Sequence, residues 1–397
     1  MLMFKVVRAW VGQFLSLRWL GYVVLAILVF FLFFWRLSGL VPGLAPSEIS
    51  ARATSLGVHT IYHDPINGPL KLIQYAFLKI SPTSAVSIRL GSVIVACLFG
   101  LCFYRLASSW FGRLIGLFAS LIFISLPLFV IAGRTGDGQI MLFSPILLSW
   151  LYFWLLKSEK HKSQIWALLL LSAAALVYTP GILWFVAAGM VITRKRVMAA
   201  IADIKPWISG LALLAAAGTI TPLILSSISQ PAIIKRLLLI PTDWQSALTV
   251  AKNFGWMLLA LFAKSPAHNQ LILGRTPLLS VVVLALVIFG VYAMQAAART
   301  KAAGLGLVIL LAVTAAAINN NLVYLALGLP AIGLLAAAGL RYLYIEWRNI
   351  FPRNPVPKTF ALILIAAVTL SQLYFGIRYS LVAWPQSVAT RTTYVLK

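Results

Sequence analysis

Negative charge is the scarcest chemical feature of this chain: its 397 residues contain 7 Asp and Glu against 32 Lys and Arg. Only 10% of the residues are charged while 62% are hydrophobic, and the mean hydropathy is +0.98. So few charged residues cannot cover a water-soluble globule of this length. The composition therefore excludes a soluble globular enzyme and indicates a multi-pass membrane protein.

Other absences narrow the class further. The two cysteines, Cys97 and Cys102, share one apolar run with no His or carboxylate beside them, so we interpret them as packing residues rather than metal ligands. The apolar runs do not alternate with polar residues, which excludes barrel strands. The net charge of +25 is scattered over short connectors. That pattern favours contact with anionic lipid headgroups and control of topology, and we expect no nucleic-acid partner.

The apolar runs predict an all-α transmembrane bundle, because lipid-exposed backbone must hydrogen-bond within its own segment. We count about eleven runs of suitable length. They lie near residues 20–39, 86–107, 113–131, 140–156, 164–178, 181–193, 207–225, 278–295, 303–318, 322–344 and 360–376. Lys5, Arg8 and Arg18 precede the first run, and no small-residue cleavage site follows it, so we interpret it as an anchor rather than a signal peptide.

The basic connectors predict the orientation, because Lys and Arg near span ends stay on the cytoplasmic side. With a cytoplasmic N-terminus, the dense basic connectors fall inside, at residues 105–113, 157–164, 194–205, 296–303 and 341–358. The extracytoplasmic segments then include residues 40–85, 133–139 and 226–277. The C-terminal tail is also extracytoplasmic in this arrangement.

Four of the seven acidic residues fall in the predicted outer loops, namely Glu48, Asp64, Asp137 and Asp243. Residues 46–57 predict a short helix, with Pro46 suited to its first turn and Gly57 to its end. Arg52 follows Glu48 by four positions, a spacing that permits an ion pair on one helix face. Glu48 therefore has two interpretations, a structural partner of Arg52 or a catalytic carboxylate.

A rigid bend, HDPINGP, follows this helix and contains His63 and Asp64. The next segment, residues 70–80, predicts an amphipathic helix lying in the membrane interface. Its apolar side carries Leu70, Ile73, Phe77 and Ile80. Its polar side carries Lys71, Gln74 and Lys79. We therefore expect two interfacial helices in the first outer loop, joined by a tight turn.

The second outer loop, AGRTGDGQI, places Arg134 and Asp137 among glycines at the end of a span. Glycines let the backbone approach a ligand closely, and the guanidinium of Arg suits phosphate oxygens. Arg134 is either a phosphate ligand or an anchor at the headgroups. Arg52, Lys71 and Arg275 are further candidates for binding an anionic substrate.

The order of these features resembles the GT-C superfamily of polyprenyl-phosphate-sugar-dependent glycosyltransferases, in particular the branch of protein O-mannosyltransferases and the lipid A aminoarabinose transferase. The residues that carry the resemblance are Glu48, the turn from His63-Asp64-Pro65 to Pro69-Leu70, SIRLGS at 87–92, residues 110–140, and LGLPAIGLLAAAGL at 327–340. Many members have Asp-Glu where this chain has Ser47-Glu48, so Glu48 either acts alone or takes Asp64 as its partner. We expect no counterpart of the C-terminal soluble domain of the larger members within residues 1–397.

The resemblance implies roles for particular residues. Glu48 would be the general base for the acceptor or would position the lipid-linked donor, and Arg134 and Asp137 would contribute to a phosphate site. His63 and Asp64 are weaker candidates for the partner of Glu48. A divalent metal is possible but not required by the resemblance. We expect residues 1–397 to form one GT-C-like domain, with the catalytic loop in 1–160 and the remaining spans in 161–397.

These observations predict an integral plasma-membrane glycosyltransferase that moves a sugar from a polyprenyl phosphate to a lipid, glycan or protein acceptor on the extracytoplasmic face. A carboxylate accepts the acceptor's proton, and an Arg stabilises the departing phosphate. Two alternatives stay open. A transporter or flippase of a lipid-linked glycan would need ionisable residues deep in its spans, which are scarce here. A non-catalytic GT-C-like binding protein would explain the reduced acidic pair.

Overall fold

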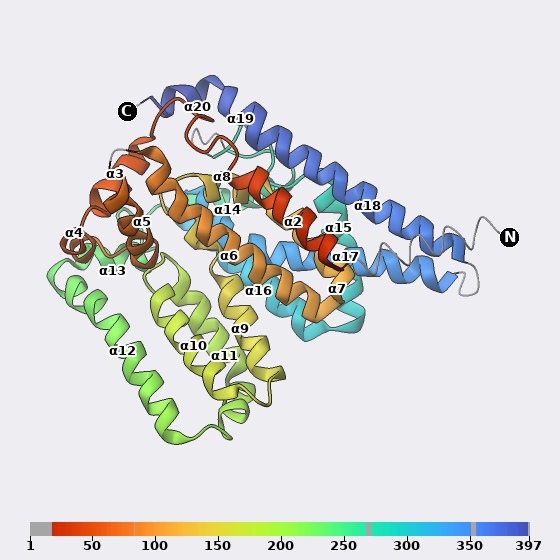
Figure 1. Cartoon of the computed structure of the whole chain (residues 1–397), viewed down its shortest axis with the longest axis horizontal. Coiled ribbons are helices and arrows are strands. Elements are labelled where there is room, and N and C mark those ends of the chain that lie inside the picture. Colours follow the sequence, from red (N-terminus) through yellow and green to blue (C-terminus); the bar gives the residue numbers. More distant parts are fainter. Residues whose placement is uncertain (1–17, 83, 267–270, 351–354, 396–397) are drawn as a thin grey trace.

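The computed structural model describes residues 18–82, 84–266, 271–350 and 355–395, and every element of regular secondary structure in these residues is helical (Figure 1). The first half contains α2 (Arg18–Phe33), α3 (Pro46–Thr54), α4 (Val58–His63), α5 (Gly68–Ile80), α6 (Ala85–Phe111), α7 (Arg113–Ile124), α8 (Pro127–Arg134), η1 (Gln139–Phe143), α9 (Pro145–Lys157), α10 (Lys162–Leu176) and α11 (Ile182–Ile201). The second half contains α12 (Pro206–Ser229), α13 (Pro231–Leu237), α14 (Ala247–Phe262), α15 (Val281–Ala297), α16 (Arg299–Ile318), η2 (Leu322–Leu327), α17 (Leu329–Ile350), α18 (Pro355–Ile377), η3 (Arg378–Ala383), α19 (Trp384–Gln386) and α20 (Val388–Thr393). The prediction of an all-α fold is confirmed. Lys5 and Arg8, which flank the predicted anchor, lie outside the described residues.

Six helices in the described residues are long and apolar enough to cross a membrane, and α7 with α8 makes a seventh span if the bent pair is taken together. Three further apolar helices, α10, α14 and α15, are shorter. The chain is therefore a multi-pass membrane protein, with six to seven spans supported where the sequence predicted about eleven. The two helices of the bent pair diverge by 64°, because Pro127 has no N–H with which to continue the hydrogen bonds of α7.

The core lies where α6, α7, α8 and α17 pack together. Its largest buried side chains include Phe99, Phe103, Phe123, Phe129 and Phe143. The rings of Phe103 and Phe123 stack with their centroids 4.2 Å apart. Helices α15 and α17 cross closely, and a Cβ on Gly290 or Gly339 would overlap a carbonyl oxygen of the facing helix. Glycine at both positions therefore sets how closely these two helices approach.

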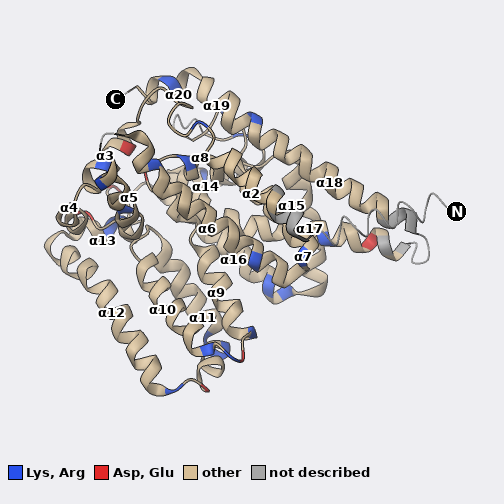
Figure 2. Cartoon of the chain, viewed as in Figure 1, with Lys and Arg blue, Asp and Glu red and all other residues tan. Residues whose placement is uncertain are grey.

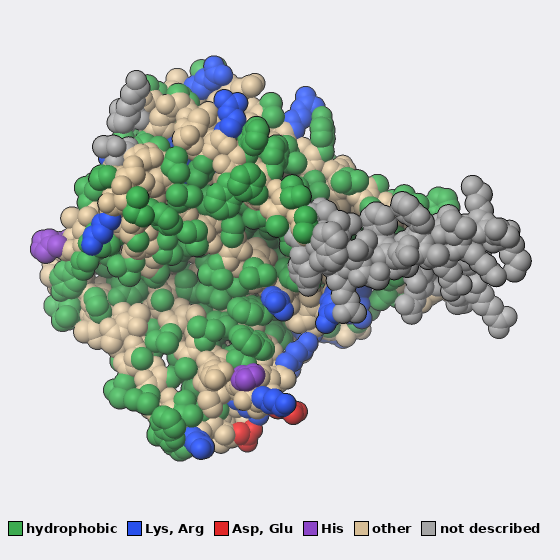
Figure 3. Space-filling view, viewed as in Figure 1, with side chains coloured by type: hydrophobic (Ala, Val, Ile, Leu, Met, Phe, Trp, Pro, Cys, Tyr) green, Lys and Arg blue, Asp and Glu red, His purple; other side chains and the backbone are tan. Residues whose placement is uncertain are grey.

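The outside of the bundle is apolar, as expected for a surface in contact with lipid. Trp207, Leu214 and Ile228 of α12 are 63%, 71% and 72% exposed. Hydrophobic side chains cover most of the face in Figure 3, and Figure 2 shows Lys and Arg mainly near helix ends. Exposed apolar patches of this extent are rare on soluble monomers.

The first loop folds into three helices, α3, α4 and α5, where the sequence predicted two. Helix α5 packs part of its predicted polar side against the protein: Lys71 and Gln74 are 6% and 1% exposed. Of the predicted apolar side, Leu70 is also buried at 1%, whereas Ile80 is 81% exposed. Gln74 donates to the carbonyl oxygens of Ile88 at 3.1 Å and Gly136 at 2.8 Å, and Lys71 binds a carboxylate. Because both polar side chains have partners, their burial costs little.

Candidate functional site

Glu48 lies in the first turn of α3 and is fully buried. Pro46 begins the helix, and the Glu48 carboxylate reaches back to accept the N–H of Ala45 at 3.2 Å. A carboxylate at this position is favoured because the free N–H groups of a helix N-terminus carry partial positive charge. The predicted short helix is present and ends at Thr54.

The partner of Glu48 is Arg89 of α6, not Arg52. The Arg89 Nε donates to Glu48 Oε1 at 2.9 Å, and one terminal nitrogen donates to Oε2 at 2.9 Å. Glu48 Oε1 also accepts the N–H of Gly136 at 2.8 Å. With the N–H of Ala45, four donors occupy the roughly four acceptor positions of this carboxylate. Glu48 is therefore fully engaged with the protein.

Arg89 ties the first loop to the span that carries it. Its remaining contacts go to the carbonyl oxygens of Leu37 at 3.0 Å and Gly43 at 2.7 Å. Arg89 belongs to SIRLGS at 87–92, one of the segments that carry the family resemblance, but the sequence alone predicted no role for it. The sequence did contain an indication of this role, because an arginine inside an otherwise apolar span needs a buried partner of opposite charge.

Asp137 lies in the turn between α8 and η1, next to the Glu48 cluster. It accepts hydrogen bonds from Thr135 Oγ1 at 3.1 Å, Gln139 Nε2 at 2.6 Å and Ser47 Oγ at 3.4 Å. Burial, together with the nearby charge of Glu48, raises the pKa of Asp137 to about 6. The pKa of this carboxyl therefore lies closer to neutral pH than that of an ordinary Asp, in the range that suits a general base.

Arg134 is the last residue of α8 and is buried, with 4% of its surface exposed. It donates to the carbonyl oxygens of Leu32 at 2.7 Å and Trp35 at 2.6 Å, at and just beyond the end of α2. Among the described residues, no ion pair neutralises it. Arg134 thus holds α2 in place and leaves an uncompensated positive charge beside the Glu48 cluster.

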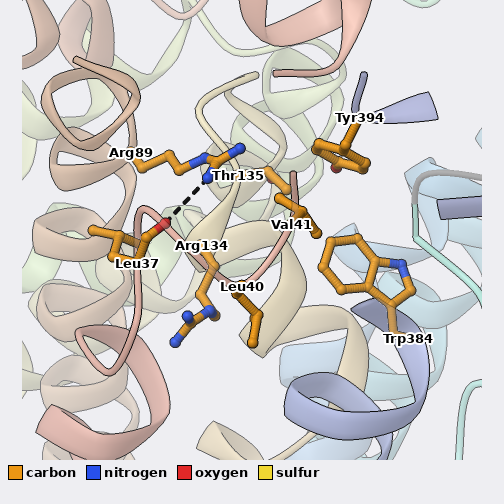
Figure 4. Close-up of a pocket in the computed structure, with 8 residues that line it drawn as sticks. All are labelled: Leu37, Leu40, Val41, Arg89, Arg134, Thr135, Trp384 and Tyr394. Carbon is orange, nitrogen blue, oxygen red and sulfur yellow. Dashed lines mark hydrogen bonds between the residues drawn. The ribbon is translucent and has the colours of Figure 1, made fainter. Parts of the chain in front are cut away.

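A pocket opens beside these arginines (Figure 4). It is lined by Leu37, Leu40, Val41, Arg89, Arg134, Thr135, Trp384 and Tyr394, and its empty space, including the part open to solvent, is about 220 Å³. Very little of this space is enclosed: it has room for about one water molecule, whereas ligand sites usually enclose about 300 to 1,000 Å³. The pocket must therefore widen before it can hold a phosphate group or a lipid-linked sugar.

The C-terminal segment forms one wall of the pocket. Trp384 and Tyr394 are 2% and 0% exposed, and their rings meet edge to face with centroids 5.5 Å apart. Helices α19 and α20 lie near α3 at the same end of the bundle (Figure 1). The Tyr394 hydroxyl is buried without a hydrogen-bond partner. Burial and the charges of Asp137 and Glu48 raise the pKa of Tyr394 well above its usual value, so it is a neutral donor here. The tail therefore folds over the cavity.

The other predicted site residues form a second cluster. Lys71 Nζ lies 2.8 Å from Asp64 Oδ2, and Arg236 of α13 lies 3.7 Å from Oδ1. His63 packs against His59, with ring centroids 4.5 Å apart. The structure thus brings together Glu48, Asp137 and Arg134, whereas Asp64, His63 and Lys71 lie apart from them. Asp64 does not contact Glu48 as the partner that the sequence suggested.

Two further candidates lie outside both clusters. Arg52, in the last turn of α3, is half-buried, and Arg275 is exposed with its carbonyl oxygen accepting the N–H of Ser265 at 3.2 Å. Within the described ranges, no group of three or more His, Cys, Asp or Glu converges as a metal site. The oxygens of Glu48 are already occupied by Arg89 and two backbone N–H groups, so a divalent metal at Glu48 would have to displace an ion pair. The donor set does not fit a resident metal.

Comparisons with known proteins agree with this fold. Residues 69–225 match the family model described as dolichyl-phosphate-mannose-protein mannosyltransferase. No curated protein sequence matches the chain. The structure of ArnT from Cupriavidus metallidurans in the apo state superposes with a TM-score of 0.56 and 13% identity, over 98% of this chain and 75% of ArnT. The structure of the same ArnT bound to undecaprenyl phosphate superposes with a TM-score of 0.58 and 13% identity, over 94% of this chain and 75% of ArnT.

A third solved structure is the archaeal oligosaccharyltransferase AglB from Archaeoglobus fulgidus, in complex with an inhibitory peptide and a dolichol-phosphate. It has a TM-score of 0.54 and 15% identity, over 90% of this chain and 55% of AglB. The family match over residues 69–225 and these superpositions agree with the predicted resemblance to the GT-C superfamily, and this multi-pass chain shares its fold with these GT-C structures.

Proposed function

We propose that this GT-C-fold membrane protein is a glycosyltransferase that moves a sugar from a polyprenyl phosphate to a hydroxyl group of a lipid, glycan or protein acceptor. The observation that carries the proposal is the position of Asp137, a carboxylate with a pKa of about 6, beside a pocket that contains an unpaired arginine. The match to a mannosyltransferase family and the fold shared with ArnT support the same reaction class.

We assign the general base to Asp137 rather than Glu48. All acceptor positions of Glu48 serve Arg89 and backbone N–H groups, so a proton from an acceptor would have to break an ion pair there. Asp137 also accepts four hydrogen bonds, from Thr135, Ser47 and the backbone and side-chain N–H groups of Gln139, but all of these donors are neutral. The one from Ser47 is long, at 3.4 Å, so an acceptor hydroxyl has to displace only a weak neutral hydrogen bond at Asp137. Asp137 contacts Ser47, and Ser47 stands where many GT-C members carry the first Asp of an Asp-Glu pair. Asp137 therefore offers a carboxylate next to the position from which the family carboxylate is missing. Glu48 becomes a positioning residue that holds Arg89 and Gly136.

The reaction then follows from the chemistry of the donor. The acceptor hydroxyl gives its proton to Asp137 as its oxygen bonds to the anomeric carbon, and the bond from that carbon to the phosphate oxygen breaks. The polyprenyl phosphate leaves with the electron pair and gains negative charge. Arg134 supplies fixed positive charge at the pocket, and the Tyr394 hydroxyl can donate to a phosphate oxygen.

Two features support an extracytoplasmic site in the plasma membrane. The segment that carries Glu48 is a predicted outer loop, and the predicted C-terminal tail on the same side packs beside it (Figure 1). Because the tail narrows the pocket, the sugar-lipid enters by displacing Trp384 and Tyr394. A lid of this kind would exclude water from the activated sugar.

The decisive experiment relocates the carboxylate. In purified protein with a panel of polyprenyl-phosphate sugars, Asp137→Asn should lower single-turnover transfer by about 100-fold or more. Adding Ser47→Asp to Asp137→Asn should restore part of the rate, because it returns a carboxylate to the same place. Asp243→Asn, at an exposed carboxylate outside both clusters, is the matched control and should keep full activity.

Full transfer by Asp137→Asn would refute its assignment as base. If the unaltered protein binds a polyprenyl phosphate but transfers sugar from no donor, the binding-protein alternative replaces the enzyme. The complete occupation of the Glu48 carboxylate by protein donors is the observation that favours this second candidate.

A further inference from the structure

Basic residues from four distant segments gather near the end of α6, where Trp110 is the penultimate residue; three of them contact Ser109 or Trp110, and the fourth lies near Lys301. Lys157, at the end of α9, donates to the carbonyl oxygen of Ser109 at 2.9 Å. Arg341 of α17 donates to the carbonyl oxygen of Trp110 at 3.3 Å. Lys301 of α16 lies over the indole ring, with Nζ 4.6 Å from its centroid. Lys157, Arg341 and Arg196 of α11 are all near enough to interact electrostatically with Lys301.

This basic cluster, defined as Lys157, Arg196, Lys301 and Arg341, has no acidic partner among the described residues. The ion pairs in the described part of the chain involve other cations; Lys162, for example, binds Asp203 at 2.6 Å. All four side chains of the cluster are exposed. Like charges this close repel one another unless an anion lies between them.

The cations keep many free donors. A lysine ammonium has three N–H groups and an arginine five, and each bond to a carbonyl at the end of α6 uses only one. The positions of Lys157 and Arg341 follow from the negative end of the α6 dipole, to which cations are attracted. Lys301 contacts the face of Trp110 and donates no hydrogen bond to any other residue that the structure describes. The Trp110 indole N–H is also without a hydrogen-bond partner.

The cluster lies at the level where apolar spans end. Helix α6 ends at Phe111, α9 ends at Lys157 and α16 begins at Arg299. Helices α6 and α16 are each long and apolar enough to span a membrane, and so is α9 when it is taken together with η1. A tryptophan among lysines and arginines at the ends of spans is typical of the headgroup region. An anion that meets these cations at this level is therefore attached to a lipid.

We propose that the basic cluster and Trp110 form a binding site for the phosphate of an anionic phospholipid headgroup. All four cations come from connectors that the sequence predicts to be cytoplasmic, so the lipid would belong to the leaflet opposite the Glu48 site. Basic residues scattered over cytoplasmic connectors are enough to set the topology of a membrane protein. The basic cluster differs from such scattered charge because residues of four segments converge near the single aromatic ring of Trp110. Its occupancy would hold α6, α9, α16 and α17 together and does not depend on sugar transfer.

Native mass spectrometry of the full-length protein in detergent, titrated with phosphatidylglycerol or cardiolipin, tests the proposal. Lys301→Gln with Arg341→Gln should weaken the first bound lipid at least about tenfold. Lys160→Gln with Arg299→Gln removes the same charge from exposed positions in or next to the connectors of Lys157 and Lys301, and should change binding less than about twofold. Lys301→Arg keeps the cation and should retain the site.

Three results would overturn the site. If both double variants lose lipid affinity equally, then the total charge of the protein, and not this cluster, binds the lipid. Equal binding of phosphatidylcholine would show that the anionic headgroup is not recognised. Full competition by millimolar inorganic phosphate would identify a site for soluble anions instead. Thermal unfolding of each variant without added lipid confirms that a weakened lipid signal does not come from misfolding.

Discussion

The two carboxylates of the first loop form three ion pairs whose surroundings differ sharply. In the Glu48 pair, the side chains of Glu48 and Arg89 are 0% and 2% exposed. Asp64, with 30% of its side chain exposed, pairs with Lys71, which is 7% exposed, and with Arg236 of α13, which is 63% exposed. The Glu48 pair joins the loop to a span and fills its acceptors completely, whereas the pair of Asp64 with Arg236 keeps one side open to solvent. The comparison separates a buried pair that fixes the architecture from an exposed pair that can exchange partners.

The largest expected effect is the loss of Arg89. Arg89→Ala leaves the Glu48 carboxylate buried without a cation, and breaking a buried pair typically costs about 3–5 kcal/mol. We expect the free energy of unfolding, measured by SDS titration of the purified protein, to fall by that amount. The free energy of unfolding of Arg89→Lys should lie between those of Arg89→Ala and the unaltered protein. Lysine keeps the positive charge, but its ammonium cannot make the bidentate contact of the guanidinium.

The double variant Glu48→Gln with Arg89→Met is the control for this prediction. Removing both charges leaves no unpaired ion, so the double variant should be more stable than Arg89→Ala. If Arg89→Ala unfolds at the same SDS concentration as the unaltered protein, the pair does not fix the loop.

The two pairs were not equally visible in the sequence. The short helix of Glu48 followed from Pro46 and the residues after it, because such signals act within one turn of chain. Arg89 is 41 residues from Glu48, and its role depends on how the loop docks on α6. The nearer candidate, Arg52, satisfied the helix spacing, so local geometry favoured the wrong partner.

Tertiary contacts also determine the orientation of α5 and the position of the C-terminal tail, neither of which follows from the local sequence. The apolar runs predicted the helices, but part of the polar side of residues 70–80 turned inward because the carbonyl oxygens of Ile88 and Gly136 accept from Gln74. Tyr394, near the C-terminus, reaches the pocket through the return of the tail, which no local pattern shows. The residue types of the site were therefore predictable, while their partners required the fold.

A smaller expected effect is the pH dependence of sugar transfer, which distinguishes Asp137 from the ion-paired carboxylates Glu48 and Asp64. Its pKa is raised to about 6, so it keeps its proton to higher pH than an ordinary carboxyl. The base form appears only above that value. We expect the rate of transfer to rise about tenfold per pH unit below pH 6 and to level off above it.

The residual rate of Asp137→Asn should show no inflection near pH 6. The same raised pKa means that the contribution of Asp137 to stability is present in acid and is lost as pH rises through about 6. The active form is thus the form that folding disfavours. An inflection near pH 6 that persists in Asp137→Asn would assign the titration to another group.

The smallest expected effect is at the exposed pair. Arg236 Nη1 is 3.7 Å from Asp64 Oδ1, and most of its side chain is in solvent. Screened pairs of this kind contribute less than about 1 kcal/mol. Arg236→Ala should therefore change the SDS unfolding free energy by less than about 1 kcal/mol, and high salt should remove the difference. Lys71→Met, at the buried partner of the same carboxylate, should cost more, because Asp64 would keep only the exposed and longer contact. If Arg236→Ala costs as much as Arg89→Ala, then solvent exposure is not what distinguishes the two ion pairs.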